Sequence, residues 1–133
     1  MQKVNLQIYG GPVETHVYGM DVPFIPVVGD TIILARFRNW KKLKKVKPAN
    51  ILQLEVDEFT FIVTRRDINL EIIRKPLQPA KERSVWDHYQ PVTIHLCLCD
   101  EVTGKIETAD WAEEVVEAIG HSLGIMGYHM MYQ

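Results

Sequence analysis

The chain has 133 residues, of which 47% are hydrophobic and 24% charged, with a formal net charge of -2. This length is typical of one domain, so we expect a single domain over residues 1–133, and the hydrophobic content excludes a globally disordered chain. No apolar run approaches the ~18 residues that cross a bilayer, and the first residues form no apolar signal block. Cys97 and Cys99 lie too close together on one strand for an ordinary disulfide. These features predict a cytoplasmic protein without membrane contact.

The first forty residues alternate apolar and polar side chains, a pattern typical of half-buried strands. It predicts strands at residues 3–8, 13–18 and 31–37. The sequence Gly10-Gly11-Pro12 predicts a turn that joins the first two strands as a hairpin. Gly29-Asp30 predicts a turn into the third strand.

The middle of the chain continues this alternation but changes its phase. The alternating run at 51–56 is followed by apolar residues on odd numbers, so we expect a bulge or tight turn at Asp57-Glu58. Arg65-Arg66-Asp67 predicts the next turn, with a strand at 68–72 after it. Residues 76–91 contain three prolines and no clear period, which predicts a long irregular loop.

One amphipathic helix is predicted over about residues 109–123, because apolar side chains recur there at helical spacing. Asp110 is the expected N-cap, with Glu113 completing a capping-box-like pair, and Thr108 is the alternative cap. Gly124 is the expected residue at the C-terminal end.

The remaining strands complete the predicted fold class. Residues 92–99 are apolar on both faces of a strand, residues 105–107 predict a short return strand, and a last strand is expected within 125–132. About seven strands and one late helix indicate an α+β domain. We expect mostly antiparallel pairing, a small curved barrel or half-barrel, and a C-terminal helix that covers the sheet.

Residues 36–50 form a basic excursion in an otherwise acidic chain. Residues 36–47 carry seven cations and no acid, which leaves eight cations against 17 acids in the rest. Clustered cations beside an aromatic ring are typical of phosphate-backbone binding, and a charge run is also typical of a solvated loop or of one folded onto an acidic body. The candidate nucleic-acid or partner contacts are Arg36, Arg38, Trp40, Lys41, Lys42, Lys44, Lys45 and Lys47.

His95, Cys97 and Cys99 alternate with apolar residues and therefore share one face of their strand. Zinc accepts these side chains, but His95 and Cys99 would be roughly 13 Å apart along a straight strand. We therefore predict no metal, no cofactor and no catalytic residue. The alternative is a small enzyme whose site assembles around His88, His95 and Cys97.

The tract Trp86-Asp87-His88-Tyr89 offers a second candidate contact. Trp86, His88 and Tyr89 would form a recognition loop if their rings are exposed. The same rings would pin the loop to the body if they are buried.

The sequence favours a non-enzymatic binding or interaction module with a protein partner. Nucleic-acid binding through residues 36–47 is the first alternative, and the small enzyme is the second. An exposed edge strand near the C-terminus would also allow a homodimer.

Overall fold

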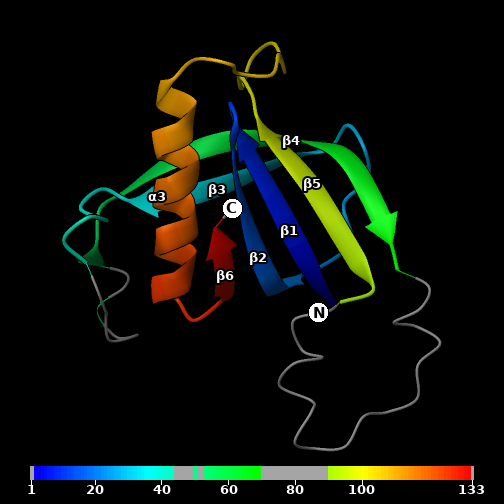
Figure 1. The fold of residues 1–133 in the computed structure, drawn as a ribbon, viewed down its shortest axis with the longest axis horizontal. Coiled ribbons are helices and arrows are strands. Elements are labelled where there is room, and N and C mark those ends of the chain that lie inside the picture. Colours follow the sequence, from blue (N-terminus) through cyan, green and yellow to red (C-terminus); the bar gives the residue numbers. More distant parts are fainter. Residues whose placement is uncertain (1, 44–49, 51–52, 70–89, 133) are drawn as a thin grey trace, which may run out of the picture.

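The computed structural model describes residues 2–43, 50, 53–69 and 90–132. Six strands form one sheet in the order β3-β4-β5-β1-β2-β6, and helix α3 packs against it (Figure 1). Within the described residues of this α+β domain, most of the buried apolar side chains belong to one hydrophobic core cluster. None of the helices in the described part of the chain is long and apolar enough to cross a membrane.

The predicted first hairpin is confirmed by β1 (Gln2–Gly10) and β2 (Val13–Val22), which pair antiparallel. Gly11 lies in the turn with a φ of 59°, a left-handed conformation that glycine adopts without a steric cost. Val4, Leu6 and Ile8 are buried in the core, as the two-residue alternation predicts.

The next two strands are β3 (Thr31–Phe37) and β4 (Val56–Ile68), again antiparallel. The predicted breaks at Asp57-Glu58 and at Arg65-Arg66-Asp67 are both wrong, because β4 runs through both sites. Its register shifts instead between Val63 and Arg65, opposite β5. The charged side chains at these sites are accommodated in the strand because they have partners at the sheet surface: Asp57 contacts Arg36 of β3, and Asp67 contacts Arg65 of the same strand and His95 of β5.

Strands β5 (Val92–Leu98) and β6 (His129–Tyr132) complete the sheet. β5 pairs antiparallel with β4 and parallel with β1, and β6 pairs antiparallel with β2 at the far edge. The predicted return strand is reduced to one bridge between Cys99 and Ile106. Four of the five strand pairings are therefore antiparallel.

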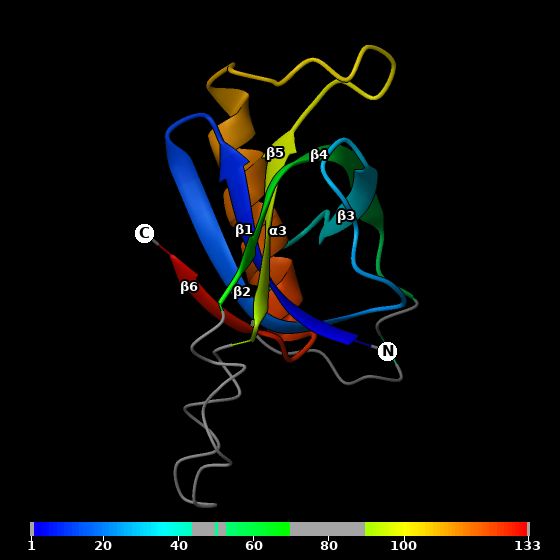
Figure 2. The same ribbon diagram turned by 90° about the vertical axis from the view of Figure 1, so that its right-hand side faces the viewer.

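Helix α3 (Trp111–Ile125) covers the concave face of the half-barrel that the strands form (Figure 2). It buries Val115, Val116, Ile119 and Leu123 against the core side of the strands. This confirms the predicted amphipathic C-terminal helix, with bounds shifted by two residues.

The predicted N-cap residue, Asp110, directly precedes the helix as expected, but the capping geometry at both helix ends differs from the prediction. Asp110 adopts a helical φ and ψ of -59° and -32° and makes no side-chain cap, because a capping residue needs an extended backbone. At the other end Gly127, with a φ of 98°, donates to the Gly124 carbonyl, while Tyr128 donates to that of Leu123. This pair of bonds is a Schellman motif, so Gly127 rather than Gly124 ends the helix.

Two predicted segments lie mostly outside the described residues. Of the strand expected at 68–72, only Ile68 and Asn69 are described, and of the loop at 76–91, only Gln90 and Pro91.

Candidate functional site

The basic segment leaves the end of β3 as consecutive backbone turns. Trp40 N–H donates to the Phe37 carbonyl at 3.1 Å, Lys42 N–H to Asn39 at 2.9 Å, and Leu43 N–H to Trp40 at 3.3 Å. These bonds hold the chain in a tight path next to helix α3. The cationic side chains of residues 36–42 are thereby gathered around a small volume.

Two of the cations fold back onto acids at the start of β4 and directly before it. Arg38 contacts Glu55 at 2.8 Å and Asp57 at 3.1 Å, and these carboxylates raise its pKa, the Asp57 hydrogen bond most. Arg36 Nε lies 3.6 Å from Asp57 Oδ2, and its guanidinium lies 5.2 Å from the centre of the Phe59 ring. Much of the positive charge of both arginines is therefore compensated within the molecule.

Lys41 and Lys42 differ from the arginines. Both are exposed, and neither makes an ion pair with any residue that the structure describes. Lys41 Nζ lies 5.6 Å above the Trp40 ring, a cation–π distance. Trp40 in turn meets the His121 ring of α3 edge-on at 5.6 Å, and His121 Nε2 bonds the Leu43 carbonyl at 2.8 Å.

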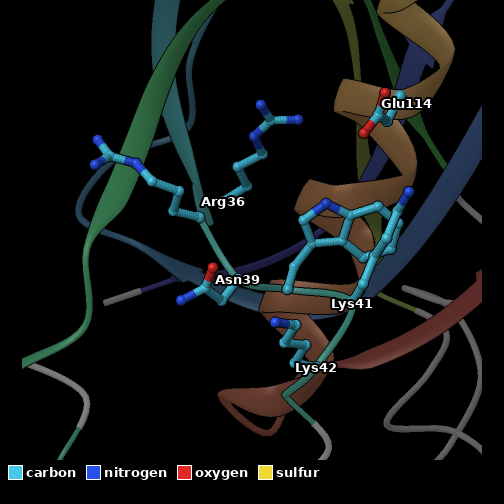
Figure 3. Close-up of a pocket in the computed structure, with 7 residues that line it drawn as sticks. Arg36, Asn39, Lys41, Lys42 and Glu114 are labelled. Carbon is cyan, nitrogen blue, oxygen red and sulfur yellow. The ribbon is translucent and has the colours of Figure 1, made fainter.

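A cavity of about 250 Å³ lies among these side chains (Figure 3). Arg36 reaches toward it from β3 and Glu114 from α3, while Lys41 and Lys42 come from the turns that follow β3. We call this cavity the basic pocket; its lining residues are Arg36, Arg38, Asn39, Trp40, Lys41, Lys42 and Glu114.

The chemistry of the basic pocket is that of an anion site with one acidic wall. Pockets for drug-sized ligands measure about 300–1,000 Å³, so this one fits a side-chain-sized group better than a whole cofactor. Lys41 and Lys42 can each donate hydrogen bonds to a carboxylate or a phosphate. Glu114 repels densely charged anions and can accept a bond from an N–H beside the anionic group.

The structure places five of the predicted contacts at this pocket: Arg36, Arg38, Trp40, Lys41 and Lys42. Lys44, Lys45 and Lys47 lie outside the described residues. The same is true of the predicted recognition loop with Trp86, His88 and Tyr89. Sequence reasoning missed Asn39 and Glu114, and Glu114 had no signal because it comes from a helix more than seventy residues away.

A second polar cluster lies on the sheet face opposite the helix, and it joins three strands. His95 Nε2 lies 2.8 Å from Asp67 Oδ2, and its Nδ1 lies 3.1 Å from the Tyr9 hydroxyl. Arg65 donates twice to Asp67, at 2.9 and 2.7 Å. We call these four side chains the His95 network.

The His95 network is satisfied internally. The Arg65 hydrogen bonds lower the pKa of Asp67 to about 2, assisted by His95 and opposed by burial. Burial, followed by the charge of Glu14, raises the pKa of the Tyr9 phenol. Both ring nitrogens of His95 are occupied, so neither is free to activate a neighbouring nucleophile.

His95, Cys97 and Cys99, for which the sequence predicts one common face, lie at or next to β5 in surroundings that disfavour a thiolate. Burial raises the pKa of both thiols, which disfavours the nucleophilic thiolate. Cys97 has Thr64 Oγ1 at 3.9 Å as its polar neighbour. Within the described residues, no group of three His, Cys, Asp or Glu side chains could hold a metal ion. His88, the third member of the proposed enzyme site, lies outside them.

Comparison of the chain with protein-family models, curated proteins and solved structures finds no match. The geometry of the molecule alone therefore carries the functional proposal.

Proposed function

We propose that this protein is a non-enzymatic binding module whose basic pocket takes an acidic side chain of a protein partner. The observation that carries the proposal is the contrast among four cations on one short segment. Arg36 and Arg38 are paired with Glu55 and Asp57, whereas Lys41 and Lys42 stand exposed and without ion pairs among the described residues, beside Trp40. Unpaired lysines at a concave aromatic surface favour an external anion.

A protein carboxylate suits the basic pocket better than a polyphosphate chain. Glu55 and Asp57 lie beside the pocket and Glu114 lines it, so a polyanion that extends past Lys41 and Lys42 meets acids. A single acidic side chain can reach the lysines while its own backbone N–H groups face Glu114. The two thiols, which are free cysteines in the structure, support a cytoplasmic location for this interaction.

Single-stranded nucleic acid is the second candidate. Trp40 and its neighbouring lysines are the observation that favours it, because stacking and cations are combined in such sites. Two phosphate contacts predict a slope of log affinity against log salt of about -1 to -2.

Fluorescence anisotropy with two labelled probes separates the two candidates. The probes are a peptide of alternating glutamate and glycine, and an oligothymidylate with the same number of charges. We expect the wild type to bind the peptide more tightly, and the double variant Lys41→Ala/Lys42→Ala to lose about tenfold or more in affinity. The matched control is Lys105→Ala, an exposed lysine of the loop before α3, which should bind as the wild type does.

The variant Glu114→Gln sharpens the distinction. Removal of this acid should improve binding of the oligothymidylate and leave peptide binding equal or weaker. If the wild type binds the oligothymidylate more tightly than the peptide, single-stranded nucleic acid replaces the acidic side chain as the proposed ligand. Peptide binding that is unchanged in the lysine double variant would refute the basic pocket as the site.

A further inference from the structure

Strand β3 is one edge of the sheet, and half of its backbone groups face away from β4. Val63 N–H donates to the Asp30 carbonyl, and Arg38 N–H to that of Glu55, so even-numbered residues bond to β4. In an antiparallel pair the bonding residues alternate, so the peptide groups of Thr31, Ile33 and Ala35 point to the other side. No strand of the described residues pairs with that side.

The far end of this edge is closed by the helix. Phe37 N–H, which also points away from β4, donates to Ser122 Oγ of α3 at 3.0 Å. The Ser122 hydroxyl itself donates to the Ala118 carbonyl at 2.8 Å. The backbone N–H and C=O groups that remain available for pairing with another strand are therefore those within residues 31–35.

The open part of the edge is apolar and exposed. Ile33 is 63% exposed, and the segment leading into β3 exposes Phe24 and Val28 by 67% and 62%. A groove of about 500 Å³ lies beside it, lined by Phe24, Asp30 and Ile32 among others. The part of β3 from Thr31 to Ala35 carries no charge and no proline, and an edge segment without these protecting residues invites pairing with another strand.

We propose that β3 pairs antiparallel with β3 of a second copy of this chain, centred on Ile33. In that register the free groups of Ile33 face those of Ile33 in the second copy, and Thr31 faces Ala35. Asp30 then lies opposite Arg36 of the second copy, which also contacts Asp57 of its own chain, and the two-fold axis repeats this arrangement of opposite charges. The match of bonding groups, apolar side chains and charges in one register favours a second copy over an unrelated strand.

The first test is the mass of the full chain by sedimentation equilibrium. The wild type should form a dimer of the 15.4 kDa chain. Ile33→Lys places two like charges opposite each other and should weaken the dimer about tenfold or more. Val102→Lys, at a valine that is 86% exposed in a distant turn, is the matched control and should remain a dimer. A monomeric wild type, or a dimer that Ile33→Lys leaves unchanged, overturns the proposal.

Cross-linking tests the register. The Cα atoms of Ile33 in the two copies should lie about 5.5 Å apart, within the range of a disulfide, so Ile33→Cys should give a covalent dimer on mild oxidation. Thr31→Cys is the control, because two Thr31 residues would lie roughly 13 Å apart in the same register. Cross-linking of Thr31→Cys but not of Ile33→Cys would overturn the register. Wild-type protein sets the background from Cys97 and Cys99.

Discussion

On the outer face of the sheet, Asp67, Arg65 and Tyr9 surround His95, and every charge has a partner within the molecule. At the end of β3, the lysines of the basic pocket have no ion-pair partner among the described residues. Both regions bring together residues from distant parts of the chain. The His95 network ties three strands to one another, whereas the basic pocket keeps its positive charge available.

We infer from this difference that the His95 network serves the stability of the fold and that the basic pocket serves binding. A buried or half-buried group whose hydrogen bonds are all made inside the protein is expected to stabilise the fold. Exposed charged side chains without ion-pair partners contribute little to the free energy of folding. They remain available to bind another molecule. The predictions below test this division.

The largest effect is expected from His95→Ala. His95 is 6% exposed, and its removal leaves the Tyr9 hydroxyl and Asp67 without their shared partner. The free energy of unfolding should fall by about 2–3 kcal/mol in urea titrations. Peptide binding at the basic pocket should be unchanged in the folded variant. A loss below about 0.5 kcal/mol, the range of ordinary surface changes, would mean that the network is not structural.

Ser122→Ala tests the hydrogen bond that joins α3 to the end of β3, next to the basic pocket. The substitution leaves the buried Phe37 N–H without its acceptor, at the point where β3 meets the helix. An unsatisfied buried donor costs about 1–3 kcal/mol, to be measured by the same urea titration. Binding of the peptide should weaken as well, because Arg36 and the turn that follows depend on this junction. Full stability in this variant would argue that the helix is held to β3 by apolar packing alone.

A smaller, pH-dependent effect is expected from Asp67. Its pKa in the folded protein is about 2, below the usual 3.8, so the folded state holds the ionised form more strongly than the unfolded state does. The resulting stability is fully present above pH 3.8 and is lost as the pH falls toward 2. Asp67→Asn should therefore flatten the pH dependence of stability in this window. An equally steep acid loss in that variant would assign the effect to other carboxylates.

The smallest change in stability is expected from Lys41→Ala/Lys42→Ala. Both side chains are exposed and without ion pairs in the described part of the chain, so the free energy of unfolding should stay within about 0.5 kcal/mol of wild type. The same variant should lose peptide binding. A large loss of stability would show that these lysines serve the fold, in contrast to the division proposed above.

Much of the fold follows from the rhythm of apolar residues. The two-residue period locates β1, β2 and β3, the helical period locates α3, and a short run that is apolar on both faces locates β5. The path of β4 was not predictable from this rhythm. Arg65 and Asp67 look like a polar turn in one dimension, and only the neighbouring strand shows that they bond to each other and to His95.

The candidate site was predictable in part. The run of cations with Trp40 points to the basic pocket, since local composition is visible in the sequence. Which cations are compensated was not predictable, because Asp57 reaches Arg36 and Arg38 only through the register of β3 with β4. Glu114 enters the pocket through the packing of α3, which no local pattern encodes.

The central claim is that the basic pocket receives an acidic side chain, and the indole N–H of Trp40 is its most direct reporter. In a two-dimensional nitrogen–proton spectrum, titration with the glutamate–glycine peptide should shift the Trp40 indole peak, identified through Trp40→Phe. The indole peak of Trp111, which is 51% exposed and lies outside the pocket, should stay in place. Equal shifts of both peaks, or a Trp40 peak that stays fixed while the peptide binds, would contradict the account.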